Sequence, residues 1–531
     1  MTDAARPRVL VRETIADAGV ELLRERFDVD VDLDGDLGAI IGGYDALIVR
    51  SATKVSRELI EQATRLRVIG RAGVGVDNVD LDAASARGIV VANAPQSTVV
   101  SAAEHTIGLL LSLARNIPQA HAALTDGRWE RSRFGGLELS GKTLGLVGFG
   151  RIGQQVARRA AGLEMQVAAY DPFVAPERFR AAGVTRTETL AELLGDSDFL
   201  SLHLTLTPET TGIVGREALG AAKQGIRVVN VARGELVDEE ALIEALEAGV
   251  VAGAALDVFS AEPYSGPLLG RPNVIVTPHL GASTGEAQDR AGVIVAEQVA
   301  AALDGGPVTN AVNMPAVGAE DLEVLSPYLP LAGDLAGLAC GLAGGSPARL
   351  ELVYLGQLAV RDTRLLTVAA LNGLFKGRVE QPVNYVNAPV IARERGIEVR
   401  ESTSSASADY TSLIEVTAYD ENGQGFAVAG TTIGRDSRLQ VVRALDYEID
   451  VELSRSMLFA ENDDRPGMIG RVGTIMGEAG INIANMAVSR NRPEARALMA
   501  LSLDSPVPDE VLELLRAEPG ILAARFVALP E

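Results

Sequence analysis

The stretch from Thr143 to Gly153, TLGLVGFGRIG, constrains the fold of this chain more than any other segment. An apolar run at 144–147 predicts a buried parallel strand, which ends in a glycine-rich turn. A helical stretch follows the turn, and a second apolar run at 165–170 ends at Asp171. This order of strand, glycine turn, helix, strand and acid is typical of a dinucleotide-binding unit.

The three glycines of the turn, Gly148, Gly150 and Gly153, have separate predicted roles. The first permits the tight turn, the second lets a pyrophosphate approach the backbone, and the third lets the helix pack closely on the strand. Asp171 is placed to accept hydrogen bonds from the adenosine ribose, which favours NAD because a 2′-phosphate would meet a like charge. The alternative is an ordinary glycine-rich turn, but the flanking strands and the acid favour dinucleotide binding.

Length and charge limit the class of protein. At 531 residues the chain is too long for one hydrophobic core and predicts three or four domains. It has 48 Lys and Arg against 71 Asp and Glu, a formal net charge of −23. So acidic a chain repels phosphate backbones and anionic lipid, which argues against nucleic-acid or membrane-surface binding. A small anionic substrate remains possible where a few arginines converge.

The chain has a single cysteine, Cys340, so no disulfide can form within it. Its apolar surroundings, LAGLACGLAGG, favour a small core residue over a nucleophile. The first residues, MTDAARPRVLVRE, contain no apolar signal region, and no run of about 20 residues is free of charge. We therefore expect a soluble cytoplasmic protein.

The first three-fifths of the chain alternate strand and helix. Residues 8–98 predict a parallel α/β unit without a nucleotide fingerprint, and a long helix over 97–125 leads into the glycine turn. A helix over 285–303 is long enough to cross back to the first unit. The sequence thus predicts two doubly wound parallel-sheet α/β domains, with a Rossmann NAD domain inserted into a substrate domain.

The remainder of the chain predicts two smaller α+β units. Gly, Pro and Asn gather near 305–320 and indicate a boundary, and the following segment shows short strands and helices but no chemical motif. The last segment predicts the ferredoxin-like order βαββαβ. The predicted domains are 1–98 with 288–316 (substrate-binding), 99–287 (NAD-binding), 317–453 (intervening) and 454–531 (ferredoxin-like).

Three polar residues shortly after apolar runs form a plausible set for oxidation of an alcohol: Arg233, Glu262 and His279. The imidazole would take the hydroxyl proton, the carboxylate would fix its tautomer and favour its charged form, and the guanidinium would bind a carboxylate. The hydride would pass to a nicotinamide, so no metal is required. The alternative is that each is an ordinary residue at a strand end.

The other histidines are interpreted as structural, and they are His105, His121 and His203. Trp129, the only tryptophan, lies between charged residues and predicts an interface or packing contact.

A second group of residues lies in the first unit. Arg50 and Ser51 follow one apolar run, and Arg71 follows the next, directly before a turn at 72–75. Successive backbone N–H groups in such a turn can bind an anion. Two arginines beside that turn would suit a substrate with two anionic ends, although two surface arginines on an ordinary turn are the alternative.

With these residues assembled, the chain resembles the D-isomer specific 2-hydroxyacid dehydrogenases, in their long form with an intervening domain and a C-terminal ACT domain. The resemblance covers nearly all of 1–316 and rests on RSATKV, RAGVGVDNVD, SAAEHTIGLLLSLAR, GFGRIG, NVARGELVDE, DVFSAEP and TPHLGAST. It is weakest in the intervening segment.

The resemblance implies roles for individual residues. The catalytic residues would be Arg233, Glu262 and His279, and the substrate would be held by Arg50, Ser51, Arg71, Val74 and Gly75. NAD would contact Gly148, Gly150, Arg151, Ile152, Gly153, Asp171, Thr207, Val231, Ala232, Asp257 and Gly281.

The resemblance further implies an NAD-dependent oxidation of 3-phospho-D-glycerate to 3-phosphooxypyruvate, the first step of phosphorylated L-serine synthesis. Two alternatives stay open: a dehydrogenase of another D-2-hydroxy acid, and a non-catalytic protein that senses NAD. The family also implies dimers formed through the NAD domains, to which Trp129 and Arg131 could contribute, and a tetramer.

The C-terminal segment resembles an ACT domain, a small amino-acid-sensing module. Its loop ENDDRPG and the following GINIANM make Asn462, Asp464 and Asn482 candidates for binding L-serine as an effector between two paired modules. The chain departs from its relatives at Asn462, where His or Tyr is common, and at Thr205, where proline is common.

Overall fold

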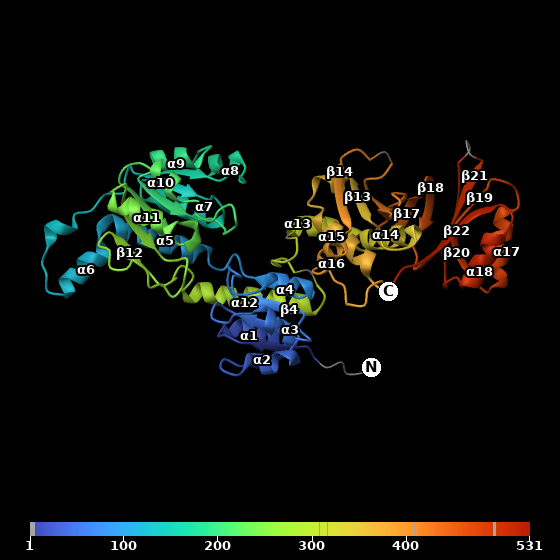
Figure 1. Ribbon diagram of the computed structural model, residues 1–531, viewed down its shortest axis with the longest axis horizontal. Coiled ribbons are helices and arrows are strands. Elements are labelled where there is room, and N and C mark those ends of the chain that lie inside the picture. The colour runs from blue at the N-terminus through green and yellow to red at the C-terminus, as the bar shows by residue number, and fades with distance from the viewer. Residues whose placement is uncertain (1–5, 307, 316, 408, 492–494, 531) are drawn as a thin grey trace.

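The computed structural model describes residues 6–306, 308–315, 317–407, 409–491 and 495–530. The described residues form four β-sheets spread along an elongated molecule, with the second sheet at one end, the first beside it, and then the third and the fourth (Figure 1). Two sheets are parallel, the third is mixed and the fourth is antiparallel. The predicted fold class, two parallel α/β units followed by two α+β units, is confirmed.

The first sheet is parallel in the order β2-β1-β3-β4-β5. Its strands are β1 (Arg8–Val11), β2 (Asp28–Val31), β3 (Ala46–Val49), β4 (Val68–Arg71) and β5 (Val90–Asn93). Its helices are α1 (Asp17–Arg24), α2 (Leu37–Ile40), α3 (Arg57–Gln62) and α4 (Leu81–Ala86). The central strand β3 is buried along its whole length, as a strand covered on both faces requires.

The second sheet is parallel in the order β12-β11-β10-β9-β6-β7-β8. Its strands are β6 (Thr143–Val147), β7 (Gln166–Tyr170), β8 (Thr185–Arg186), β9 (Phe199–Leu202), β10 (Ile226–Asn230), β11 (Val251–Leu256) and β12 (Val274–Val276). Its helices are α7 (Arg151–Gly162), α8 (Pro176–Ala181), α9 (Leu190–Asp196), α10 (Arg216–Gly220) and α11 (Glu239–Glu247). The strand order reverses between β6 and β9, and ligands of such sheets bind at the carboxyl end of this switch point.

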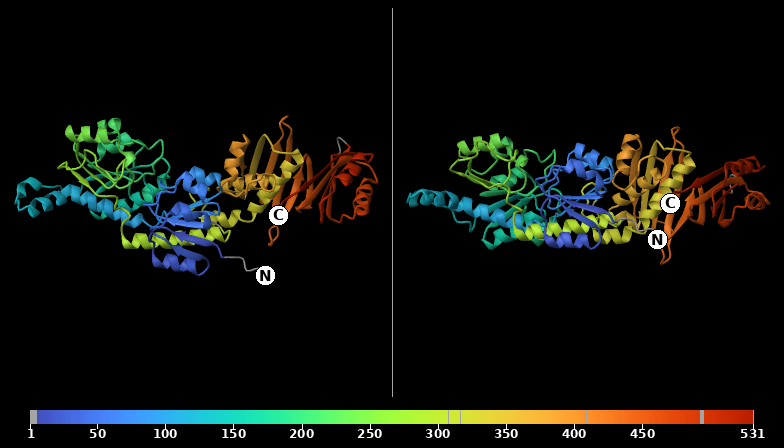
Figure 2. Two further views of the ribbon diagram at one scale, coloured as in Figure 1. Left: turned by 60° about the horizontal axis from the view of Figure 1, so that its bottom comes forward. Right: turned by 90° about the horizontal axis from the view of Figure 1, so that it is seen from below.

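Two helices carry the chain between the parallel sheets. Helix α5 (Val99–Arg115) leads from the first sheet to the second, and α12 (Gly285–Leu303) returns. The apolar face of α12 packs against α1 and β4 of the first sheet, and Figure 2 shows the helix running along both units. The two parallel sheets are therefore joined twice.

The predicted single helix over 97–125 is wrong, because the structure breaks it into α5 and α6 (Ile117–Thr125). The break is at Asn116, whose φ of 53° lies in the left-handed region that asparagine tolerates better than most residues. Pro118 then fits the first turn of the new helix. The break directs α6 away from the second sheet, and it projects from the molecule (Figure 1).

The third sheet has the order β14-β13-β15-β16-β17-β18, with only β13 and β14 parallel. Its strands are β13 (Arg349–Gly356), β14 (Glu398–Ser404), β15 (Ser412–Tyr419), β16 (Gly425–Ile433), β17 (Arg438–Ala444) and β18 (Tyr447–Glu452). Its helices are α13 (Ala319–Leu325), α14 (Tyr328–Ala343), α15 (Arg364–Phe375) and α16 (Ala388–Glu394). Cys340 is buried in α14 and belongs to this core, as predicted.

The fourth sheet has the ferredoxin-like order β20-β21-β19-β22. Its elements are β19 (Ser456–Asp463), α17 (Met468–Glu478), β20 (Ile483–Asn491), β21 (Arg496–Leu503), α18 (Asp509–Ala517) and β22 (Ile521–Ala528). One face of this sheet joins the core of the third unit, where Val527 lies against Gly341 of α14. Arg455 pairs with Asp334 across the same contact at 2.8 Å. The third and fourth units therefore share a hydrophobic core.

Candidate active site

The glycine turn joins β6 to α7. Gly148 has a φ of 94°, and a Cβ at this position would collide with the backbone of His203. Gly150 faces open space, so phosphates can approach its backbone. A Cβ on Gly153 would collide with the carbonyl of Gly148, so the third glycine permits close contact of helix and turn. Each glycine thus has the geometry that its predicted role requires.

The start of α7 and the end of β7 complete this part of the site. No side chain caps α7 at Gly150, so the first backbone N–H groups, those of Arg151 and Ile152 among them, are available to an anion. Asp171 accepts hydrogen bonds from the N–H groups of Phe149 at 2.8 Å and Phe173 at 2.9 Å. A carboxylate accepts about four hydrogen bonds, so capacity remains for ribose hydroxyls. The residues present fit a dinucleotide.

Arg233 joins the two groups of residues that the sequence places far apart. It follows β10, and its Nε lies 3.4 Å from Oδ2 of Asp77, in the turn after β4. A Cβ on Gly75 would collide with the guanidinium of Arg233, so this side chain lies directly on the predicted anion-binding turn. The catalytic candidate Arg233 and the substrate-binding candidate Gly75 therefore belong to one site.

Arg71, the last residue of β4, contributes a second guanidinium to the same turn. A Cβ on Gly73 would collide with it, and its Nε is buried without a hydrogen-bond partner among the described residues. Burial, together with repulsion from Arg233 and Arg50, lowers the pKa of Arg71. A buried cation beside two further cations is not a source of stability, and the role of Arg71 in binding an anion stays a prediction.

Glu13 shapes the substrate side of the site, and the sequence analysis missed it. Its carboxylate accepts hydrogen bonds from the N–H groups of Arg50 and Thr53, both at 2.9 Å, and of Ala52 at 3.2 Å. Burial would raise the pKa of Glu13, but these hydrogen bonds hold it below its ordinary value. The loop that carries Arg50 and Ser51 is thereby fixed from within. Glu13 lies two residues beyond Val11, the end of the apolar run of β1, so a search of the polar residues shortly after such runs could have found it.

His279 and Glu262 form the predicted pair. Nδ1 of His279 lies 2.9 Å from Oε2 of Glu262, and Oε1 of Glu262 accepts the N–H of Phe259 at 3.2 Å. Because the carboxylate occupies Nδ1, Nε2 is left to exchange a proton with a substrate. Both side chains are partly exposed, which leaves them accessible to a ligand.

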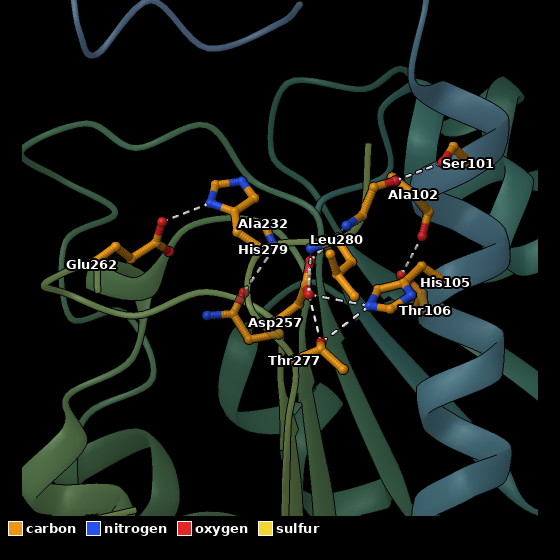
Figure 3. A network of polar contacts seen from close by, with 12 residues as sticks. Ser101, Ala102, His105, Thr106, Ala232, Asp257, Glu262, Thr277, His279 and Leu280 are labelled. Atoms are coloured by element: carbon orange, nitrogen blue, oxygen red, sulfur yellow. Dashed lines mark hydrogen bonds and ion pairs between the residues drawn. The ribbon is translucent and has the colours of Figure 1, made fainter. Parts of the chain in front are cut away.

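Asp257 lies at the end of β11 and is fully buried (Figure 3). Its carboxylate accepts the N–H groups of Leu280 and Gly281, both at 2.8 Å, and the hydroxyl of Thr277 at 2.5 Å. Nε2 of His105 lies 3.2 Å from the same carboxylate. Burial would raise the pKa of Asp257, but these hydrogen bonds hold it below its ordinary value. The implied contact of Asp257 with NAD stays a prediction.

The other cofactor candidates lie at the carboxyl ends of the second sheet. A Cβ on Gly281 would approach Val231 and Asp257, so these three residues lie together. Ala232 follows β10, where its N–H donates to Asn230 at 3.0 Å. Thr207 lies in the loop after β9, where its N–H donates to Thr210 at 2.8 Å. Their contacts with a cofactor stay predictions.

The remaining histidines and Trp129 have different surroundings. Burial lowers the pKa of His203 to about 4, and its Nε2 lies 2.9 Å from the hydroxyl of Ser201, so it is a neutral structural residue. His121 is exposed on α6, and Trp129, in the segment after that helix, is 81% exposed. Such exposure excludes a role for Trp129 in the core. Among the described residues no three His, Cys, Asp or Glu side chains could hold a metal ion.

The effector candidates lie in the fourth unit. Asn462 is buried near the end of β19, and its Oδ1 has no hydrogen-bond partner among the described residues. Oδ1 of Asp464 lies 3.3 Å from Nε of Arg490, and Asn482 donates to Asp504 at 2.5 Å. The effector role of these residues stays a prediction. In the described ranges no helix has the length and apolar character needed to cross a bilayer.

Comparison with protein-family models gives three matches in chain order. Residues 107–281 match the NAD-binding domain of the D-isomer specific 2-hydroxyacid dehydrogenases. Residues 324–443 match the D-3-phosphoglycerate dehydrogenase intervening domain, and residues 456–520 match the ACT domain.

Individual relatives extend this similarity to nearly the whole chain. The D-3-phosphoglycerate dehydrogenase of Methanocaldococcus jannaschii is 44% identical over 518 residues, which cover 97% of this chain and 98% of the relative. That of Archaeoglobus fulgidus is 42% identical over 530 residues, 98% of this chain and 100% of the relative. Among solved structures, the TT0316 protein of Thermus thermophilus is 39% identical with a TM-score of 0.53, over 57% of this chain and 99% of that structure.

Proposed function

The chain belongs to the D-3-phosphoglycerate dehydrogenases of the D-isomer specific 2-hydroxyacid dehydrogenase family, and on this premise we propose that it oxidises 3-phospho-D-glycerate to 3-phosphooxypyruvate with NAD. This reaction is the first step of the phosphorylated route to L-serine. The ion pair of Arg233 with Asp77 is the observation that carries the proposal, because it joins the catalytic residues of the second sheet to the anion-binding turn of the first.

In the proposed mechanism the protein binds both ends of the substrate. Arg233 would hold the carboxylate bidentately, beside the hydroxyl that reacts. Arg71 and Arg50 would bind the phosphate, together with Ser51 and the backbone of Val74 and Gly75. Two anionic groups would thus meet the cations that otherwise repel each other.

His279 would take the proton of the C2 hydroxyl at Nε2, and Glu262 would stabilise the resulting imidazolium through Nδ1. NAD bound at the glycine turn supplies the hydride acceptor. The N–H groups of Arg151 and Ile152 would hold its pyrophosphate and Asp171 its ribose. The protein itself therefore needs only to orient the substrate and to move one proton.

A substrate panel tests the proposal. Purified protein would be mixed with NAD and either 3-phospho-D-glycerate, D-glycerate or D-lactate, and NADH formation would be followed by absorbance. We expect kcat/KM to be highest for the phosphorylated substrate. A preference for an unphosphorylated acid would favour the alternative dehydrogenase, and NAD binding without turnover of any acid would favour a sensing protein.

L-serine is the proposed effector, and it would bind to the ACT domain. The buried, unpartnered Oδ1 of Asn462 supports this assignment because it can accept a hydrogen bond from a ligand ammonium. Asp464 and Asn482 would complete the site between two ACT domains. Isothermal titration of the protein with L-serine and with D-serine tests the assignment, and equal heats for both enantiomers would reject it.

We also propose that the protein is a dimer through its NAD domains, which pairs further into a tetramer through its ACT domains, and that it works in the cytoplasm. The projecting α6 segment supports the first contact, since Ile117, Leu124 and Trp129 expose 52%, 56% and 81% of their surface. Arg131 follows in the same segment. Light scattering of the wild type and of Trp129→Ala tests the dimer, which the substitution should weaken.

A further inference from the structure

Helix α5 contacts the loop that carries His279 at two points. The hydroxyl of Ser101 donates a hydrogen bond to the carbonyl of Gly281 at 2.8 Å, and Nε2 of His105 lies 3.2 Å from Oδ1 of Asp257. Residues four apart in a helix lie on one face, one turn from each other. Figure 3 shows both side chains directed from α5 toward this loop. One face of α5 therefore lies against segment 279–281.

Asp257 connects that face to the backbone of the loop. Its carboxylate accepts the N–H groups of Leu280 and Gly281, while its own carbonyl accepts the N–H of His279 at 2.8 Å. His279 has a φ of 57°, an uncommon value for a residue other than glycine. Such a conformation persists only where the surroundings hold it. Three consecutive N–H groups bound to one buried residue provide that support.

The hydrogen bonds also fix the tautomer of His105. The low pKa of Asp257 leaves an ionised carboxylate that has no hydrogen to donate, so Nε2 of His105 must carry one. The hydroxyl of Thr277 donates to the same oxygen at 2.5 Å. In that tautomer Nε2 donates whether the imidazole is neutral or charged. Without His105 the buried carboxylate of Asp257 would lose one hydrogen-bond donor. Because that carboxylate is charged, the loss would destabilise its present arrangement.

The position of α5 between the two parallel sheets explains why this contact matters for the active site. The helix starts shortly after β5 and carries the chain from the first sheet to the second. Arg290 of α12, the returning connection, donates to the carbonyl of Ser97 at 2.9 Å just before α5. The Ser101 and His105 face therefore lies where both connections between the sheets meet.

We propose that Ser101 and His105 are positioning residues, which hold the loop of His279 at a fixed position relative to the substrate-binding sheet. This inference rests on the proposed function, which assigns proton transfer to His279. Neither side chain needs to touch the substrate. Their effect would pass through Asp257 and the backbone of 279–281 to the orientation of the imidazole.

Steady-state kinetics of His105→Leu, His105→Gln, Ser101→Ala and Thr106→Val test the proposal. Thr106 is the matched control, because it is the next residue of α5, is buried, and donates its hydroxyl to the carbonyl of Ala102 within the helix. We expect His105→Leu to lower kcat about tenfold, the equivalent of one hydrogen bond to a charged group, with KM changed less than about twofold. His105→Gln, which keeps an N–H donor, should regain most of the rate. Ser101→Ala should lower kcat about threefold, as one neutral hydrogen bond would, and Thr106→Val should match the wild type.

Imidazole NMR provides a readout without turnover. The chain has 4 histidines, and a His279→Gln variant identifies the ring signals of His279 by their loss. In the absence of substrate and cofactor these signals should shift in His105→Leu and Ser101→Ala, and should keep their positions in Thr106→Val.

Unchanged His279 signals, or equal kinetic losses in His105→Leu and Thr106→Val, would overturn the inference. If the wild type turned over no acid, the proposed function would fail while the NMR comparison still decided the role of His105 and Ser101. If His105→Leu failed to fold, Ser101→Ala would decide it alone.

Discussion

Arg71→Met should separate binding of the phosphate from the rest of the reaction. The guanidinium lies on the turn that carries Gly73, with a buried Nε that has no partner among the described residues. Burial and the charge of Arg233 lower the pKa of Arg71, so the charged guanidinium destabilises the unliganded protein. Methionine keeps much of the apolar stem and removes the charge. Arg71→Met should therefore keep or raise the stability of the unliganded protein and lower its activity.

The magnitude follows from the hydrogen bonds that a guanidinium can make. Two parallel N–H donors to a phosphate, each contributing about 1.5 kcal/mol, amount to about 3 kcal/mol. At about 1.4 kcal/mol for each factor of ten, kcat/KM for 3-phospho-D-glycerate should fall about 150-fold. D-glycerate has no phosphate, so its kcat/KM should change less than about threefold. The unliganded variant should be at least as stable as the wild type.

The assay measures kcat/KM for both substrates by NADH absorbance, and thermal unfolding with and without inorganic phosphate. Arg57→Met is the matched control, because Arg57 lies on α3 of the same unit and its Nε is 3.7 Å from Asp80. Phosphate should stabilise the wild type and the control more than Arg71→Met. Equal losses for the phosphorylated and the unphosphorylated acid would refute the assignment of Arg71 to the phosphate.

Three further predictions concern the second sheet. Glu262→Gln removes the carboxylate that lies 2.9 Å from Nδ1 of His279, so kcat/KM should fall about tenfold, and an unchanged kcat/KM would reject the pair. Asp171→Asn should raise KM for NAD and narrow the preference of kcat/KM for NAD over NADP, whereas an unchanged cofactor ratio would remove Asp171 from the ribose site. Burial lowers the pKa of His203 from 6.5 to about 4, so the unfolded state binds the proton first as pH falls. Stability should therefore drop by roughly 2 kcal/mol between about pH 7.5 and about pH 5, and denaturant unfolding of His203→Gln should lack this part of the pH dependence.

Much of the fold and site could be predicted because the informative residues lie at ends of apolar runs. A buried parallel strand must be apolar, so the first polar residue after it marks the edge where ligands bind. That reasoning selected Arg71, Arg233 and His279 without any knowledge of their partners. The glycine turn was equally predictable, since few sequences other than a dinucleotide turn place glycines at these positions between two strands.

The rest depended on contacts between segments that are distant in sequence. The helix break at Asn116 is a local choice between two conformations that asparagine tolerates, so the helical pattern of 97–125 concealed it. His105 resembles any polar residue of a helix until Asp257 comes beside it from a strand about 150 residues later. The contact of Val527 with Gly341 requires two complete sheets and leaves no periodic signal in either segment.

The two connections between the parallel sheets explain why residues so far apart form one site. Because α5 and α12 both cross between the units, the carboxyl end of β4 is held near that of β10, and Arg233 reaches Asp77. The same geometry places Arg233 near Arg71, and like charges at short range repel where water is partly excluded. A substrate with an anion at each end removes this repulsion between the units, whereas an acid with one anionic end removes only part of it. The proposed preference for a phosphorylated hydroxy acid would therefore depend on how the two sheets are connected as well as on the individual arginines. Arg71→Met should reduce that preference while leaving the His279 and Glu262 pair intact.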